Sequence, residues 1–322
     1  MAIDAQRVPG RFLLTGSANV LLVPRISESL AGRMGILQLH PLAQCELGGR
    51  KSRFLEALFN GSFKMRKTGR LGKTLAELVA AGGYPAALAR PEPRRRSAWY
   101  RDYLETVVQR DARELIRIRS LDALPQLLEH AAAQTARLVN VSELAGPLQF
   151  SRITIREYLT LLERLFLIEE LRPWHSNRVT RLVKTPKLHL GDTGLACALL
   201  GFDAAGLAKD RTALGPLLET FVFQELRRQS GWQEDDIRFY HFRDKDNFEV
   251  DIVMERGAHE LAGVEVKTSA TVLDADFRGL RKLMDTAKNR FVAGVVLYDG
   301  DLAVSFGNNM FAIPIRLLWE TT

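Results

Sequence analysis

The residues with the clearest chemical potential lie in one stretch, FEVDIVMERGAHELAGVEVK, from Phe248 to Lys267. The stretch carries an acidic pair, Glu249 and Asp251, followed by Glu265 and Lys267 in the spacing Glu-x-Lys. Carboxylate oxygens are ligands that Mg²⁺ prefers, and a lysine can orient the attacking water and stabilise the charge that develops on phosphorus. These residue types in this order point to metal-dependent phosphodiester hydrolysis.

Two strands joined by a polar turn at residues 256–259 are expected to position these side chains. Successive side chains of a strand point to opposite faces. Glu249 and Asp251 are therefore expected on one face of the first strand, with Val250 and Ile252 on the other. Glu-x-Lys on the second strand would share a face in the same way, and the two charged faces would converge around a divalent cation.

An exposed hairpin with a charged outer face is an ordinary alternative, because Glu-x-Lys is common on strands. Three carboxylates and a lysine on otherwise apolar strands are costly to bury without partners. Whether these residues form a solvated surface or a metal site therefore depends on the elements predicted in the rest of the chain.

Composition narrows the class of protein. The chain has 322 residues, a length at which two or three domains are expected. No run approaches a membrane span, and the N-terminus lacks the apolar core of a secretory signal, so neither membrane insertion nor export is expected. Cys45 and Cys197 are far apart, which fits a reducing, cytoplasmic location. The net charge of +7 is compatible with a nucleic-acid partner without specifying one.

The middle of the chain opens at a composition break, PEPRRRS at residues 91–97, where Ser97 is placed to cap a long helix. After a second helix, Ser142 is expected to begin a short helix that Gly146-Pro147 ends. A longer helix then opens at Ser151 or Thr154, with one apolar face formed by Ile155, Tyr158, Leu159, Leu162 and Leu165. The runs LIEELRPW and PKLHLGD follow as paired strands, and together these elements have the outline of a winged helix-turn-helix.

Winged helices bind DNA when the second helix presents polar and basic residues to the major groove. Arg152, Thr154 and Arg156 lie near the start of that helix and are the candidate DNA-binding residues, together with Ser151. The loop between the paired strands is expected to contact phosphate through Arg178, Arg181, Lys184 and Lys187. Winged helices also serve as packing and protein-interaction modules, so a role in packing or in protein binding is the alternative to DNA binding.

The last part of the chain gives the hairpin its context. An amphipathic helix carrying Glu219 is followed by the strands IRFYHFR, FEVDIVM and ELAGVEVK, the helix DFRGLRKLMDTAKNR and the strand FVAGVVLYDG. The shorter strands LAVSF and MFAIPI come after them. The order helix–β–β–β–α–β is that of a restriction-endonuclease-like core, in which a hairpin leads into a mixed sheet.

This arrangement resembles the PD-(D/E)XK nucleases in the order and type of its elements. The resemblance implies that Asp251 and Glu265 hold Mg²⁺ or Mn²⁺ and that Glu219 completes the metal's second side. It also implies that Lys267 is the lysine that orients the attacking water. Val250 stands where the family signature has proline, a variation that such folds tolerate. His241 lies between aromatic residues and is expected to be a packed structural histidine.

Several runs in the first ninety residues are similar to the later part of an AAA+ ATPase domain: LLTGSAN, SESLAGR, LHPLAQCEL and AGGYPAAL. They resemble a prokaryotic ATPase family whose C-terminal half is a domain of unknown function with a nuclease-like fold. The resemblance implies that a buried strand at residues 12–14 is the sensor-one strand. Ser17 or Asn19 would be its polar tip facing the γ-phosphate, and Arg33 would sense that phosphate. A further strand is expected in ILQLHPL.

The chain departs from that ATPase family, because neither a phosphate loop nor the acidic strand that holds Mg²⁺ precedes these runs. GRLGKT contains Gly-Lys-Thr, but Lys67 stands where a phosphate loop needs glycine, and no buried strand comes before it. Thr74 is instead expected to cap the helix TLAELVAA, with Glu77 completing a capping box. We expect no ATP hydrolysis by this chain alone, and ATP would act only with the missing N-terminal part.

The sequence thus predicts a multidomain α/β protein. Residues 1–90 are expected to be the remnant of an AAA+ ATPase domain with its helical lid, and residues 91–190 a helical linker and winged-helix region. Residues 191–322 are expected to form a PD-(D/E)XK nuclease-like domain around a restriction-endonuclease-like mixed sheet.

Three functions stay open on the sequence. The first is a Mg²⁺-dependent nucleic-acid hydrolase, coupled in longer relatives to an ATPase. The second is a non-catalytic platform that binds DNA or other protein subunits, with structural carboxylates. The third is a truncated ATPase without independent activity.

Overall fold

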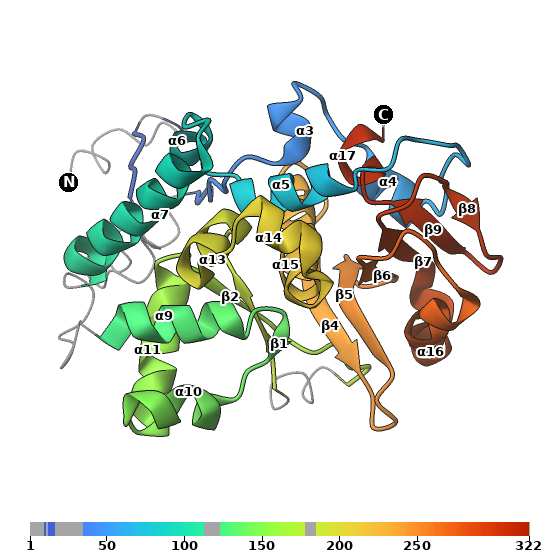
Figure 1. Ribbon diagram of the computed structural model, residues 1–322. Helices are drawn as coiled ribbons and strands as arrows, with labels where there is room; N and C mark the ends of the chain where they lie inside the picture. Colours follow the sequence, from blue (N-terminus) through green and yellow to red (C-terminus); the bar gives the residue numbers. More distant parts are fainter. Residues whose placement is uncertain (1–9, 11, 17–34, 113–122, 178–184, 322) are drawn as a thin grey trace.

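A computed structural model describes residues 10, 12–16, 35–112, 123–177 and 185–321. The fold is mixed α/β, with a six-stranded mixed sheet, a smaller three-stranded sheet and helices around both (Figure 1). In the described part of the chain, no helix combines the length and the apolar character needed to cross a membrane.

The six-stranded sheet has the order β4-β5-β6-β7-β9-β8. The first three strands are antiparallel, as expected of a hairpin that leads into the sheet, whereas β6, β7 and β9 run parallel. A short antiparallel strand, β8, closes the far edge. The strands are β4 Ile237–Arg243, β5 Glu249–Arg256, β6 Glu260–Lys267, β7 Phe291–Tyr298, β8 Val304–Ser305 and β9 Met310–Pro314.

Helices cover both faces of this sheet. On one face, the helix α16 (Arg278–Ala287) packs its Leu280 and Leu283 against Val253 and Val296. On the other face lie α4 (Phe54–Phe59) and α15 (Arg211–Ser230). The sequence predicts α15 to be amphipathic, and this is wrong: the helix is buried on most sides because it runs through the centre of the molecule.

A β-bulge in β5 breaks the expected alternation of side chains. Between Val250 and Val253, two residues of β5 lie opposite the single residue His241 of β4. As a result Val250 packs on the α16 side of the sheet while Ile252 packs on the α15 side, although the sequence predicts them on one face. Bulges redirect side chains in this way and are common beside functional sites. Here the bulge contains Asp251.

The three-stranded antiparallel sheet has the order β1-β3-β2 and lies below α13 in Figure 1. Its last two strands confirm the predicted pair. The strand β1, which has only two residues, was not predicted from the sequence. The elements of this region are α9 Ala123–Ala133, β1 Arg137–Leu138, α10 Val141–Leu148, α11 Arg152–Arg164, β2 Ile168–Leu171 and β3 Lys187–Leu190.

Helix caps account for several differences from the predicted helix ends. Ser151 caps α11 by accepting a hydrogen bond from the Thr154 amide, as predicted, and the expected apolar positions of that helix are buried. Asn140, not Ser142, caps α10, because its side chain accepts from two backbone amides. The same helix continues through Gly146-Pro147 and ends in the left-handed residue Gln149.

Two further helices begin before the predicted caps. Gly72 precedes α5, so Thr74 lies inside the helix and the predicted capping box with Glu77 is wrong. Proline at the first helical turn starts α7, which places Ser97 inside that helix. The remaining elements are α3 Gln44–Leu47, α5 Lys73–Ala81, α6 Pro85–Leu88, α7 Pro93–Val107, η2 Val108–Ala112, α13 Thr193–Leu200, α14 Ala204–Lys209, η3 Asp274–Phe277, η4 Lys288–Arg290 and α17 Leu317–Glu320.

The two strands expected near the N-terminus are not formed. Residues 12–16 and 35–40 have no regular secondary structure, and Leu13, Leu37 and Leu39 are exposed. A strand needs a neighbour to accept and donate its backbone hydrogen bonds, and the described residues supply none here. Ser17, Asn19 and Arg33, the predicted nucleotide-sensing residues, lie outside the described residues.

Candidate functional site

The predicted acidic residues and lysine come together from three elements. Glu219 extends from α15, Asp251 from the bulge in β5, and Glu265 and Lys267 from the end of β6. Lys187, the first residue of β3, joins them. We call these five side chains the acidic cluster. The sequence predicted four of its members, and the structure adds the fifth.

Lys187 links two of the carboxylates. Its Nζ lies 2.8 Å from Glu219 Oε1 and 3.1 Å from Asp251 Oδ1. The lysine side chain is only 8% exposed, and each carboxylate side chain is 13% exposed. The sequence predicts that Lys187 belongs to a basic loop that contacts phosphate. This is wrong, because β3 directs the Lys187 side chain into the interior.

The other half of the cluster is built around β6. The pairing of β5 with β6 ends at Ile252 and Val264, and beyond it Asp251 Oδ2 accepts a hydrogen bond of 3.0 Å from the Val266 amide. Lys267 Nζ lies 2.9 Å from Glu265 Oε1. Glu265 Oε2 is buried and has no hydrogen-bond partner among the residues that the structure describes. Asp251 is thus fixed by both of its oxygens, whereas Glu265 uses one.

Burial and the neighbouring charges shift the ionisation of the cluster. Burial and the negative charge of Asp251 raise the pKa of Glu265 to about 8, and they raise the pKa of Glu219 well above its ordinary value. Burial opposes the charged form of Lys187, but Asp251 and Glu219 outweigh it and raise the pKa of the ammonium. Lys187 consequently stays charged at neutral pH.

The fit of a divalent metal ion depends on these contacts. Three carboxylates offer the hard oxygen donors that Mg²⁺ and Mn²⁺ prefer. However, Glu219 and Asp251 each direct an oxygen at Lys187. Across the described ranges, no three or more Asp, Glu, His or Cys side chains are arranged so that they could hold a metal ion. The donor set suits a divalent cation, but the arrangement holds an ammonium group in its place.

Three nearby residues complete the surroundings of the cluster. Glu249, a further sequence candidate, forms an ion pair of 2.8 Å with Arg243, which is not a member of the cluster. Burial and the charge of Lys187 lower the pKa of His241 to about 3, which fits the predicted packed histidine. His189, which the sequence did not single out, lies with Nε2 4.0 Å from Glu219 Oε1 and with Nδ1 3.0 Å from Thr220 Oγ1.

The predicted DNA-binding residues lie in different environments. Arg152 is exposed at the start of α11, whereas the Thr154 hydroxyl is 2.9 Å from that of Ser151. Arg156 is half-exposed and forms an ion pair of 2.7 Å with Glu170. Arg181 and Lys184, like Arg178, lie outside the described residues.

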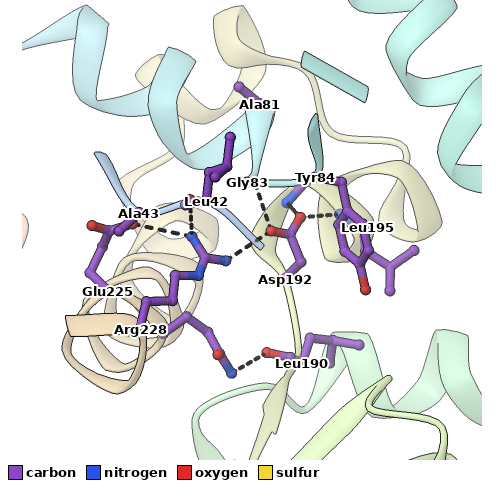
Figure 2. A network of polar contacts seen from close by, with 12 residues as sticks. Leu42, Ala43, Ala81, Gly83, Tyr84, Leu190, Asp192, Leu195, Glu225 and Arg228 are labelled. Atoms are coloured by element: carbon purple, nitrogen blue, oxygen red, sulfur yellow. Dashed lines mark hydrogen bonds and ion pairs between the residues drawn. The ribbon is translucent and has the colours of Figure 1, made fainter. Parts of the chain in front are cut away.

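A second buried polar network was not predicted. Asp192 accepts a hydrogen bond from the Gly83 amide (2.7 Å) and pairs with Arg228 at 3.1 Å (Figure 2). It also accepts a hydrogen bond from the Tyr100 hydroxyl at 3.0 Å. Arg228 also pairs with Glu225 and donates to the Leu42 carbonyl (Figure 2).

Close packing requires glycine at position 83 of this network. A Cβ at Gly83 would lie 2.6 Å from the Leu42 carbonyl oxygen and 2.7 Å from Arg228 Nη1. The network joins the segment before α3, the turn after α5 and the helices α13 and α15, so its role is to hold these elements together.

Two family models match this chain. Residues 72–206 match a domain of unknown function (DUF8612), and residues 214–318 match another domain of unknown function (DUF4143). The second domain is found in C-terminal regions associated with AAA+ ATPases, so this match supports the predicted association with such ATPases.

Curated relatives extend along almost the whole chain. Uncharacterized proteins from Mycobacterium bovis and Mycobacterium tuberculosis are each 27% identical over 99% of this chain, and the chain spans 65% of their length. An uncharacterized protein from Methanocaldococcus jannaschii is 26% identical over 85% of the chain and 59% of its own length.

One solved structure is also similar, a Thermococcus gammatolerans assembly of McrB AAA+ hexamers with bound McrC. The similarity covers 61% of this chain and 47% of that chain, at 12% identity and a TM-score of 0.26. At this score the likeness bears on neither the fold nor the function.

Proposed function

We propose that this chain is a nucleic-acid-interacting, nuclease-like part of a protein associated with an AAA+ ATPase. The observation that carries the proposal is the convergence of Glu219, Asp251, Glu265 and Lys267 from the helix and strands that a PD-(D/E)XK site uses. Domains of that kind act on phosphodiesters, so nucleic acid is the class of partner that the arrangement favours.

The middle region supports the same partner. The order α9-β1-α10-α11-β2-β3, with the sheet order β1-β3-β2, is the one expected of a winged helix-turn-helix. In such a module α11 would enter the major groove with the residues at its N-terminus foremost. Arg152 is exposed there, beside the exposed Ile153.

Fluorescence anisotropy with labelled duplex and single-stranded DNA tests this interaction. We expect the affinity to fall steeply with salt, because released counterions drive phosphate binding. R152A should weaken binding and lower the magnitude of the salt slope by about 1, the effect of losing one phosphate contact. R50A changes an exposed arginine just after α3, a helix that lies apart from α11 (Figure 1), and should leave the affinity unchanged. Absent or salt-insensitive binding would overturn the proposal.

Mg²⁺-dependent phosphodiester hydrolysis is a second candidate, favoured by the buried, unpartnered Glu265 Oε2. A metal ion would supply charge stabilisation at phosphorus, with Asp251 and Glu265 as its ligands and Glu219 completing its second side. Lys267 would then be the residue that orients water. ATP is expected to act only through an associated ATPase part.

Nicking of supercoiled plasmid in Mg²⁺ or Mn²⁺ tests hydrolysis directly. We expect activity, if the metal enters the cluster, to disappear in D251A and K267A and to survive in E249Q, since Glu249 pairs with Arg243 away from the cluster. No cleavage across several DNA and RNA substrates would reject hydrolysis and leave the binding proposal in place.

A further inference from the structure

We infer that Lys187 is the resident cation of the acidic cluster and excludes a divalent metal ion while it lies between Glu219 and Asp251. The inference rests on the nuclease-like site proposed above. It assigns to a residue of the three-stranded sheet control over a site in the six-stranded sheet.

Geometry carries the first step. Glu219 Oε1 and Asp251 Oδ1 both face the same ammonium, at 2.8 and 3.1 Å. A Mg²⁺ ion would need such oxygens at about 2.0–2.1 Å, so it would have to take the place of the Lys187 Nζ. The two cations also repel, because like charges separated by only a few ångströms interact strongly where water is scarce.

The backbone of β3 carries the second step. Lys187 pairs in register with Leu171 of β2 and Leu138 of β1, so its Cα is fixed by two neighbouring strands. Its side chain is 8% exposed, and both of its cluster partners are also mostly buried. Withdrawing the ammonium therefore requires a change in the packing between β3, α15 and β5, not a simple rotation into solvent.

Charge balance is the third step. With Lys187 and Lys267 the cluster holds two ammonium groups against three carboxyl groups. Removing the charge of Lys187 takes away the cation that lies between Glu219 and Asp251, and losing one partner of a buried ion pair is destabilising. A divalent ion is the substitute that these oxygens favour.

Mn²⁺ binding without nucleic acid, followed by electron paramagnetic resonance, tests the inference. We expect the wild-type chain to bind Mn²⁺ weakly and K187M to bind it at least about tenfold more tightly, since a nearby like charge is gone. The double variant K187M/D251N should lose that gain. K282M removes a lysine of α16 that pairs with Asp244 outside the acidic cluster, so it should leave the Mn²⁺ affinity unchanged.

Equal Mn²⁺ affinity in wild type and K187M would overturn the inference, and so would K187M that is folded by circular dichroism and binds no Mn²⁺. If K187M does not fold, Mn²⁺ binding by the wild type and by D251N tests the inference instead. Tight Mn²⁺ binding that D251N abolishes overturns the inference, and absence of such binding supports it. Because no nucleic acid is present, failure of DNA binding or cleavage would reject the proposed function without changing this result.

Discussion

Lys187 and Arg152 are both basic residues of the middle region, yet they lie in opposite environments. Lys187 is buried against two carboxylates, whereas Arg152 is exposed at the start of α11. The difference arises because β3 faces the six-stranded sheet while the N-terminus of α11 faces solvent. At the scale of single residues, the position of a basic side chain in the fold decides whether it pairs with buried carboxylates or is available to bind a partner.

Asp192→Ala tests the buried polar network. The aspartate is fully buried, and its loss leaves the buried Arg228 with Glu225 as its remaining carboxylate partner. Breaking a buried ion pair on one side typically costs about 3–5 kcal/mol. Urea denaturation should show a loss of that order, whereas D203A, at the exposed cap of α14, should cost about 1 kcal/mol. Equal effects of the two changes would contradict the structural role of the network.

His241→Gln tests the pH dependence of stability. Burial and the charge of Lys187 lower the pKa of His241 from 6.5 to about 3. Between these pH values His241 binds a proton in the unfolded chain but not in the folded chain. The free energy of unfolding therefore decreases as pH falls from 6.5 towards 3. One such group contributes at most about 1.4 kcal/mol per pH unit.

H241Q should flatten the acid side of the stability curve, measured by urea denaturation at several pH values. The exposed His259 provides the matched control, because H259Q leaves the buried histidine in place. A curve for H241Q parallel to that of the wild type between pH 4 and 6.5 would show that His241 binds its proton equally well in the folded and the unfolded chain.

At the scale of elements, close contacts fix how helices lie on the sheet. Gly279 places the start of α16 directly against the Glu249 carbonyl, so that α16 can cover β5 and β6. The bulge in β5 then turns Asp251 to the opposite side, towards α15. The position of the acidic cluster thus depends on packing and on a local irregularity in one strand.

Gly279→Ala and Gly215→Ala form a matched pair of helix substitutions. A Cβ at Gly279 would overlap the Glu249 carbonyl oxygen, whereas a Cβ at Gly215 would meet no atom within 4 Å. Thermal denaturation should show G279A destabilised by roughly 1–3 kcal/mol, the usual cost of overpacking. G215A should cost less than G279A, because the following Pro216, which disfavours a helical residue with a Cβ before it, is its main constraint. Similar stabilities for both variants would mean that α16 can shift without cost.

At the scale of the whole molecule, the two sheets are joined by polar and apolar contacts. The Trp174 amide donates to the His241 carbonyl at 2.6 Å, and the Thr135 and Thr220 hydroxyl groups lie 2.8 Å apart. The larger of the two apolar core clusters includes both Leu162 beside the three-stranded sheet and Val264 of the six-stranded sheet. The predicted division into three domains therefore does not imply three independent folding units.

Calorimetry of the whole chain should show one unfolding transition. The shared core and the buried pairs between the sheets mean that neither sheet can unfold without exposing the other. The calorimetric and van't Hoff enthalpies should agree, as they do for a two-state transition. Two separated transitions, or far- and near-UV circular dichroism curves that do not coincide, would show that the parts unfold independently.

The sequence by itself determined the six strands of the larger sheet, the helices α15 and α16, and four residues of the acidic cluster. Alternating apolar runs and turn residues are local signals, so they could be read along the chain. Only the tertiary structure decided that Lys187 belongs to the cluster, because β3 reaches α15 and β5 through long-range packing. It also decided the bulge at Asp251 and the absence of strands at residues 12–16 and 35–40, since both depend on which strands lie alongside.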